Sequence, residues 1–424
     1  MTVARKSRSH RHRLLPTSID DPVLMRPRGD SYLLLQQFAD DHAAPLATPH
    51  NYGPGPGKVT VVETDGALST DNGVCTFTAQ TTPTWGHQGF YAGAVTRVAG
   101  QMLIVDFNIS TWEGCGFGWH TAEAVVDTAS MEHAIELSAT DGVLLNEDSN
   151  IIYQGLSTGT DYKLAIVLRD VGAFYYLHDG TQWILLWLTD TGSTATLYPS
   201  FSSLAGAGTI DNFRTPASSH IPEMLIYDTF TRDDADSPGS SETVGPDGQS
   251  ATAVAWAEKH LDWDIVSNKL KNLGSTAGWP TPEWVVALDA GEADVVVEGK
   301  MTPDTGGGAT KYAGVMTRFQ DTANFWLYQT NTSGNDLRLY ERISNTWNLR
   351  ASDTVTITKG VEHTIRGSAI GNVHNCWVDD AAHATYTGSN FNTKTEHGFR
   401  AGVADHLADD FAVWPAHPTD FPEV

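Results

Sequence analysis

Five short motifs occur twice along the chain, in the same order and at nearly constant spacing. The second copy of each lies roughly 200 residues after the first. The pairs are Leu33–Asp41 with Leu225–Asp234, Trp85 with Trp279, Leu103–Phe107 with Val295–Gly299, Asp161–Leu168 with Glu362–Ala369, and Ile210–Pro216 with Asp409–Pro415. A further match, between Tyr91–Arg97 and Tyr312–Arg318, breaks this register and is interpreted as coincidence. The duplication predicts two related domains, and 424 residues also suit two domains better than one.

The join between the repeats is rich in Pro and Ser, as linkers are. It reads TPASSHIPE over Thr215–Glu223. The sequence therefore predicts an arm and a tail that flank two domains. The segments are a basic, extended N-terminal arm over 1–32, a first domain over 33–216, a linker over 217–224, a second domain over 225–416 and a C-terminal tail over 417–424.

Both repeats carry short alternating or β-branched runs and show no helical periodicity. Asn324–Asn331 and Asp336–Ile343 are two such runs, separated by turn residues. Many strands without intervening helices form antiparallel sandwiches rather than βαβ units. We therefore expect an all-β protein made of two tandem antiparallel β-sandwich domains. The strands that open and close each repeat are expected to pair, near Phe38 and Phe213 in the first and near Phe230 and Phe411 in the second.

Several motifs of the second repeat resemble those of concanavalin A-like jelly rolls of the laminin-G type. The repeat opens with D-x-F-x-R at Asp228–Arg232 and continues with W-x-I-x-x-N-K-L at Trp263–Leu270. Relatives carry a late V-D-G turn, whereas this chain has Val378-Asp379-Asp380. The resemblance implies a jelly-roll sandwich for this domain.

The first repeat is similar to modules found in virion proteins of tailed phages. It carries FADDHAAPLATP from Phe38, TPTWG from Thr82 and YKLAIVLR from Tyr162, in the family's order. The two resemblances together cover about residues 33–416. They imply the fold more strongly than the role, because this fold is used by lectins, glycosidases, adhesion modules and structural proteins.

The charge of the chain is strongly asymmetric. It has 26 Lys and Arg against 51 Asp and Glu, which gives a net charge of −25. That charge argues against nucleic acid as a main partner, because a duplex binder must neutralise phosphates. The N-terminal arm is nevertheless basic, which predicts an anchor on other virion proteins, with a solvated terminus as the alternative. Its basic residues are Arg5, Lys6, Arg8, Arg11 and Arg13.

Membrane insertion is not expected. No apolar run reaches the ~18 residues of a transmembrane helix, and no apolar signal segment follows the basic N-terminus. The protein is expected at the surface of an extracellular particle, as a homo-oligomer or as part of a large assembly. Whether Cys75 and Cys115 pair is left open.

The sequence predicts no catalytic site. Glycosidases of this fold carry E-x-D-x-x-E, and the nearest segment here, Glu292-Ala-Asp294-Val-Val-Val-Glu298, has one residue too many. In a regular strand Asp294 and Glu298 would lie about 13 Å apart, too far for retaining hydrolysis. We expect Val295 and Val297 to face the core and the acids to face solvent. No zinc-protease, nucleophile-elbow or nucleotide-binding motif is present.

Two binding sites are predicted instead. If the leucines of the two strands near Asn324–Ile343 face the core, five aromatic and arginine side chains share the outer face of the sheet. Such a face suits a glycan or a protein partner; the alternative is that the rings only cover the sheet or the domain seam. The five are Trp326, Tyr328, Arg338, Tyr340 and Arg342.

The second predicted site is a Ca²⁺ site in the loop that follows the first strand of the second repeat. Carboxylates crowd this loop, and oxygen ligands suit calcium. The alternative is an acidic, solvated loop. The candidate ligands are Asp233, Asp234, Asp236 and Asp247.

These observations favour a non-enzymatic structural or adhesive component of a tailed-phage virion, in the capsid decoration or the tail, that displays two lectin-like domains. The domains would contact surface glycans. The alternative is a secreted or cell-surface carbohydrate-binding protein of a bacterium, and a third hypothesis is a divergent glycan hydrolase.

Overall fold

The computed structural model describes residues 32–36, 59–64, 68–71, 74–111, 114–138, 142–145, 150–154, 156–273, 284–306, 310–380, 382–419 and 421. Within these ranges the chain forms antiparallel sheets and a single 3-10 turn, η2 (Thr128–Ser130). No helix of the described part is long and apolar enough to cross a membrane. The predicted all-β class is confirmed.

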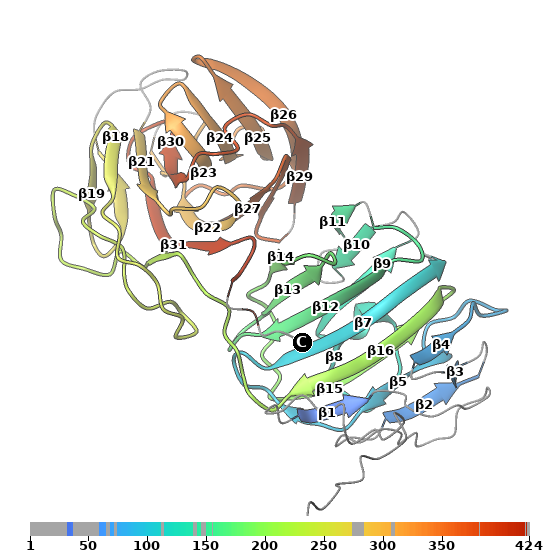
Figure 1. The fold of residues 1–424 in the computed structure, drawn as a ribbon. Helices are drawn as coiled ribbons and strands as arrows, with labels where there is room; N and C mark the ends of the chain where they lie inside the picture. The colour runs from blue at the N-terminus through green and yellow to red at the C-terminus, as the bar shows by residue number, and fades with distance from the viewer. Residues whose placement is uncertain are drawn as a thin grey trace, which may run out of the picture.

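Two sheets belong to the first half of the chain (Figure 1). Sheet A has the order β14 (Trp183–Leu188), β13 (Ala173–His178), β12 (Asp161–Leu168), β7 (Met102–Thr111), β16 (Ala207–Pro216), β4 (Val74–Phe77), β3 (Leu68–Asp71), with β1 (Tyr32–Gln36) also on β16. Sheet B has the order β11 (Asn150–Gln154), β10 (Gly142–Leu145), β9 (His133–Ser138), β8 (Cys115–His120), β15 (Thr196–Ser203), β5 (Gln88–Ala92), β2 (Val59–Glu63), with β6 (Val95–Thr96) also on β15.

Two further sheets belong to the second half. Sheet C has the order β19 (Trp263–Ile265), β20 (Leu270–Asn272), β31 (Leu407–Pro415), β22 (Val295–Thr302), β27 (His363–Ile370), β28 (Val373–Val378), β29 (Ala382–Thr387), with β17 (Ile226–Asp228) also on β31. Sheet D has the order β18 (Ala257–His260), β21 (Trp284–Asp289), β30 (Glu396–Ala401), β23 (Tyr312–Asp321), β24 (Asn324–Asn331), β25 (Asp336–Ile343), β26 (Thr346–Thr354).

Each half buries one core between its two sheets. In the first, Phe107 of sheet A lies 5.9 Å from Phe117 of sheet B, measured between ring centroids. In the second, Phe411 of sheet C lies 5.0 Å from Phe399 of sheet D. Alternate residues of every strand face one side of its sheet, so each sandwich fills its interior with alternate side chains.

The two sandwiches share one topology. Read from β3 to β14, sheet A runs through the chain in the same order as sheet C does from β19 to β29, and sheets B and D correspond in the same way. The expected pairing of opening and closing strands is confirmed, because β1 pairs with β16 and β17 pairs with β31. The match of Tyr91–Arg97 with Tyr312–Arg318 is indeed a coincidence, since the first lies on β5 and β6 and the second on β23, the counterpart of β8.

The sandwiches pack against each other through the outer faces of sheets A and C. Met102, Ile104 and Tyr176 of sheet A join Val296 and Trp414 of sheet C in one buried apolar cluster. Burial of each such side chain contributes about 1.5–3 kcal/mol. The apolar contact therefore holds the two domains together.

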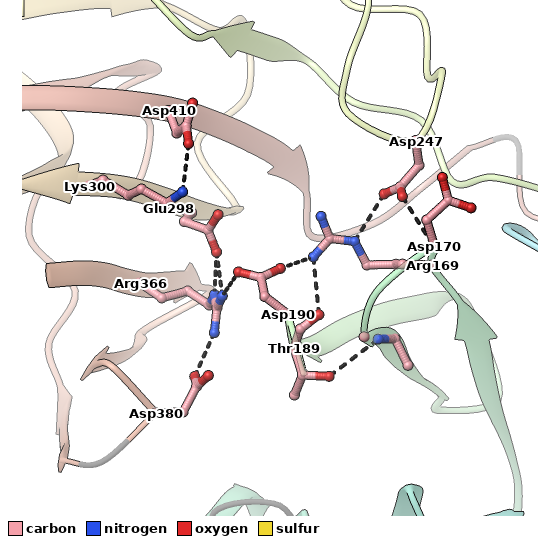
Figure 2. Close-up of polar contacts among 12 residues, drawn as sticks. Arg169, Asp170, Thr189, Asp190, Asp247, Glu298, Lys300, Arg366, Asp380 and Asp410 are labelled. Carbon is pink, nitrogen blue, oxygen red and sulfur yellow. Dashed lines mark hydrogen bonds and ion pairs between the residues drawn. The ribbon is translucent and has the colours of Figure 1, made fainter. Parts of the chain in front are cut away.

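A buried ion network completes this contact (Figure 2). Arg366 of β27 binds Glu298 through Nε and Nη2, Asp380 through Nη1 at 2.6 Å and Asp190 of the first domain through Nη2 at 2.8 Å. Asp190 also binds Arg169, whose Nε donates to Asp247 at 3.0 Å. The network thus crosses the domain contact twice.

Aromatic rings stack around the same guanidinium. The ring centroids of Trp187 in β14 and Trp377 in β28 lie 3.7 Å apart. The Cζ atom of Arg366 lies 4.9 Å from the ring centroid of Trp187. An arginine held over a Trp face gains a cation–π attraction in addition to its ion pairs.

The expectation that Asp294 and Glu298 face solvent is wrong for Glu298. Its side chain is only 9% exposed and is bound to Arg366 in the domain contact. Asp294 stays 30% exposed and accepts hydrogen bonds within its own domain, from Arg318 at 2.6 Å and from the Gly371 amide at 3.0 Å. The error at Glu298 arose because a sequence shows that alternate residues leave the core but not that another domain covers them.

We predict that Arg366→Met lowers the free energy of unfolding by about 3–5 kcal/mol, because it leaves Glu298 buried without its cation. Lys300→Met is the matched control on the neighbouring strand, since Lys300 and Asp410 form an ion pair in which both side chains are 31% exposed. The control should lose less than about 1 kcal/mol. Urea denaturation of both variants measures the difference, and equal losses would contradict a role for the network.

Candidate functional site

The outer face of β7 changes character along the strand. Met102 and Ile104 are buried against the second domain. Two residues further on, Asp106 and Asn108 point to the same side and are half-buried. The domain contact thus covers one half of sheet A and leaves the other half open.

A groove of about 420 Å³ lies over this open half. That volume falls in the range of small-ligand sites, about 300–1,000 Å³. Residues from five strands and a turn line it. They are Val74, Asp106, Phe107, Asn108, Asp161, Tyr162, Lys163, His178, Gly180, Thr209 and Asp211.

The strand register places the polar residues in cross-strand rows. The first row runs across four strands, from Asp211 of β16 through Asp106 of β7 and Lys163 of β12 to His178 of β13. Directly opposed residues in antiparallel strands share a face and interact. The second row is shorter and runs from Thr209 through Asn108 to Asp161.

A β-bulge in β16 positions the carboxylates. The register between β16 and β7 shifts after Asp211, and Asn212 has a φ of 45°. Asn212 Nδ2 donates to Asp106 Oδ2 at 3.0 Å and to Asp211 Oδ2 at 3.1 Å. The bulge thus holds two carboxylates on one amide group, and bulges often re-aim side chains beside functional sites.

The side chains of Asp106 and Asp211 lie in different electrostatic environments. Asp106 binds Arg214 Nη1 at 3.1 Å and lies 3.8 Å from Lys163 Nζ. Burial raises the pKa of Asp211 to about 6, and the charge of Asp106 acts in the same direction. Asp211 therefore holds a proton in mildly acidic solution and can donate a hydrogen bond there.

The rest of the groove offers both donors and acceptors. Asn108 Nδ2 donates to Asp161 Oδ1 at 2.7 Å, and the side chain of Lys163 is 30% exposed. Burial lowers the pKa of His178, and the nearby Lys163 lowers it further. Because His178 Nδ1 accepts a hydrogen bond from the Gly180 amide at 3.1 Å, the neutral imidazole presents a flat ring and an Nε2–H donor.

The second domain carries the same bulge without the groove chemistry. Its bulge residue Asp410 has a φ of 44°, and Lys300 stands opposite Asp409 where the first domain has Asp106 opposite Asp211. Lys300 binds Asp410 at 2.6 Å and Lys269 binds Asp409 at 2.7 Å. Lysines thus pair with both acidic residues of this bulge, whereas in the first domain the Asn212 amide bridges Asp106 and Asp211.

The predicted binding face of the second domain is wrong for two of its five residues. Trp326 and Tyr328 are fully buried in the core between sheets C and D. Trp326 stacks on His374 at 3.9 Å between centroids, and the Tyr328 hydroxyl donates to Ser368 O at 3.1 Å. Because both faces of β24 carry large apolar side chains, alternation alone did not show which face was inward.

The other three predicted residues do lie on the outer face of sheet D. Arg338, Tyr340 and Arg342 stand opposite Gln329, Leu327 and Phe325 in the register of β24 and β25. Tyr340 and Arg342 are nevertheless buried, at 7% and 4% exposure. Arg342 lies over the ring of Trp347, 4.7 Å from its centroid. This face is therefore a packed surface rather than an open one.

The four predicted calcium ligands are not brought together. Asp247 binds Arg169 in the domain contact, and its side chain is 6% exposed. Asp234 accepts a hydrogen bond from the Ser267 amide at 2.7 Å. Within the described ranges, no group of three or more His, Cys, Asp or Glu side chains could hold a metal ion. The loop carboxylates cap backbone and pair with a cation instead.

Two other predictions fall differently. The arm residues Arg5, Lys6, Arg8, Arg11 and Arg13 lie outside the described residues. The structure answers whether Cys75 and Cys115 pair, since Cys75, Cys115 and Cys376 are all buried and free. Burial raises the pKa of each thiol, so none is activated as a nucleophile.

Sequence reasoning missed the groove, although a signal for it exists. The outward residues of β7 read Met102, Ile104, Asp106 and Asn108, so an apolar half precedes a polar half on one face. The bulge also has a signature, because Ile210-Asp211-Asn212-Phe213 aligns with Ala408-Asp409-Asp410-Phe411. Acidic and amide residues tolerate the left-handed conformation that the bulge requires.

No family model matches this chain, and no curated protein matches it. Among solved structures, it is similar to the carbohydrate binding module CBM66 from Bacillus subtilis, with 15% identity over 38% of this chain and 94% of that one, at a TM-score of 0.33. It is also similar to the GH43 BlXynB protein from Bacillus licheniformis, with 10% identity over 89% of this chain and 100% of that one, at 0.31.

A third similar structure is a protein of unknown function with a galectin-like fold from Bacillus subtilis. The identity is 9% over 46% of this chain and 97% of that one, at a TM-score of 0.29. No activity, substrate or partner follows from likenesses of this degree.

We predict that Asp211→Asn raises the free energy of unfolding at pH 8 and has little effect at pH 4. Folded Asp211 releases its proton near pH 6, whereas an unfolded aspartate releases it near 4. Ionised Asp211 therefore destabilises the folded chain above about pH 6, and this effect fades as the pH falls towards about 4.

Asp289→Asn is the control of opposite sign. Hydrogen bonds from Thr395 and the Gly291 amide lower the pKa of Asp289. Ionised Asp289 thus stabilises the folded chain above its unfolded pKa, and the variant should lose stability at pH 8 and not at pH 2. Urea denaturation across this pH range measures both variants, and changes of the same sign at pH 8 would contradict the assignment.

Proposed function

We propose that this chain is a non-enzymatic glycan-binding protein and that the groove over sheet A holds the sugar. The supporting observation is an open groove in which carboxylate, amide, ammonium and imidazole groups are spread across four neighbouring strands. Sugar hydroxyls donate and accept hydrogen bonds, so this mixture of groups matches them.

The charge of the groove selects the kind of glycan. Three lining carboxylates, Asp106, Asp161 and Asp211, face one lining ammonium group, Lys163. Sulfated or carboxylated glycans would meet like charges, which cost several kcal/mol when juxtaposed. Neutral glycans are therefore the expected ligands.

Glycan hydrolysis is the second candidate function, and the pair of Asp106 and Asp211 is the observation that favours it. A retaining glycosidase needs two carboxyl groups about 5–5.5 Å apart, with one protonated and one free to attack. Asp211 has the raised pKa of an acid. Asp106 is not free, since Arg214 and Asn212 occupy its two oxygens. Because Asp106 lacks the free oxygen that a nucleophile needs, the site favours glycan binding over hydrolysis.

We further propose that the protein is an adhesive component of a tailed-phage virion, exposed on the particle surface and attached to other virion proteins through its N-terminal arm. The resemblance of the first repeat to virion modules and the opposite charges of arm and body support this role. The alternative remains a secreted or cell-surface carbohydrate-binding protein of a bacterium.

We predict that the protein binds at least one neutral hexasaccharide of a panel that comprises maltohexaose, cellohexaose, xylohexaose and chitohexaose. The double variant Asp161→Ala, Lys163→Ala removes an acceptor and a donor from the groove and should weaken binding at least about tenfold. Isothermal titration calorimetry measures the affinities, and a glycan array extends the panel.

Arg338→Ala is the matched control, because Arg338 lies on the outer face of sheet D. Its affinity should equal that of the original protein. Equal loss in both variants would move the site away from the groove, and the absence of binding to every glycan would refute the proposed function. Shortening of the oligosaccharides during incubation would show hydrolysis instead.

We predict that deletion of residues 1–30 abolishes incorporation into particles while the truncated chain still folds and binds glycans. The basic arm supplies the charge that would dock on an acidic surface. Co-assembly in an expressing host measures incorporation, and circular dichroism checks the fold. Unchanged incorporation would contradict the anchoring role.

A further inference from the structure

The groove leads directly into an aromatic platform on sheet A. His178, which lines the groove, stands opposite Trp183 of β14, and their rings lie 5.2 Å apart in an edge-on arrangement. Trp183 and Tyr176 both belong to the outer face of the sheet. A groove of hydrogen-bonding groups that continues into such rings is the arrangement that a chain of sugar units requires, because pyranose rings stack on aromatic faces.

The segment that follows the second domain covers this platform. The ring of Phe421 lies 4.5 Å from that of Trp183 and 4.7 Å from that of Tyr176, measured between centroids. Phe421 is only 7% exposed and Trp183 only 8%. The platform is therefore occupied by a ring from the end of the chain.

The covering segment, here called the strap, comprises residues 416–419 and Phe421, and it is held unevenly. At its start, the Leu185 amide donates to Ala416 O at 2.8 Å and the Ala416 amide donates to Asp294 O at 2.9 Å. Further on, the Thr419 amide and hydroxyl both donate to the Glu223 carboxylate, at 2.9 Å and 3.4 Å. Beyond His417, the described residues of the strap are thus held by two hydrogen bonds to one carboxylate and by the ring of Phe421.

Resting on the proposed function, we propose that Trp183 and Tyr176 form a sugar-stacking subsite of the groove and that Phe421 occupies it in the free protein. A glycan that extends past His178 displaces Phe421 and places a pyranose ring on the platform. The strap hinges after His417, whose ring still contacts both domains, at 3.3 Å from Trp183 O and 3.5 Å from Asp294 Oδ2. The strap then competes with the glycan for the platform. Only molecules with an open strap can bind the extended glycan, so the apparent affinity for that glycan falls as the closed fraction rises.

The test compares Phe421→Ala with the original full-length chain in titrations with the four hexasaccharides named above. Removal of the competing ring should tighten binding by up to about tenfold, the size that one aromatic pair contributes. Glu223→Ala, which loosens the strap and touches neither ring, should tighten it by a smaller factor, about two- to threefold.

Phe319→Ala is the matched control. Phe319 is also buried, at 4% exposure, but lies on the outer face of sheet D beside Phe325. It should lower the thermal midpoint and leave the affinity unchanged. The same pattern in Phe421→Ala, or weaker binding, would overturn the subsite, because Phe421 would then serve only as packing or as part of the site.

A further arm of the test separates this inference from the proposed function. Trp183→Ala should weaken the binding of hexasaccharides more than the binding of the corresponding disaccharides, since only the longer chain reaches the platform. Equal weakening would overturn the subsite and leave the groove as the sugar site. Absence of binding by both the original chain and Phe421→Ala would refute the proposed function and the subsite together.

Discussion

A buried guanidinium shared between two domains determines how the rest of this molecule is arranged. Arg366 is held by Glu298 and Asp380 of its own domain and by Asp190 of the other. A buried charge is costly unless it is paired from several sides, so this contact has a narrow choice of geometry. Once the contact is made, sheets A and C meet face to face, and half of sheet A is covered. The location of the groove follows from where that cover ends.

The duplication also shows why, among the described residues, the counterpart of this surface in the second domain lacks the groove chemistry. Both domains keep a bulge in their closing strand, at Asn212 and at Asp410, with an acidic residue just before it. The strand opposite the bulge carries Asp106 in one domain and Lys300 in the other. Lys300 and Lys269 together neutralise the acidic bulge of the second domain, whereas Asp106 adds a second carboxylate beside the bulge of the first. Differences at a few positions of a repeated framework therefore separate a self-neutralised surface from the surface that lines the groove.

Prediction from the sequence succeeded for periodic features and failed for those that depend on a neighbour. The strand runs, the duplicated order and the pairing of first and last strands could be predicted because side-chain alternation and chain topology are local or repeated properties. The direction of Trp326 and Tyr328 could not, because both faces of β24 are apolar and buried. Asp247 was assigned to a metal, yet it pairs with Arg169, which lies 78 residues earlier in the chain. A loop rich in carboxylates has the same composition whether it holds a cation from solvent or one from another domain.

The sequence by itself determined an all-β chain that repeats one kind of domain and joins an acidic body to a basic arm. Composition and repetition can be read directly from the order of residues. The tertiary structure alone decided which sheet faces are covered, which carboxylates share a donor and where the open groove lies. Those outcomes depend on the docking of two sandwiches and on the placement of the strap ending in Phe421. Contacts between residues far apart in the chain leave no periodic signal, so only the folded molecule shows them.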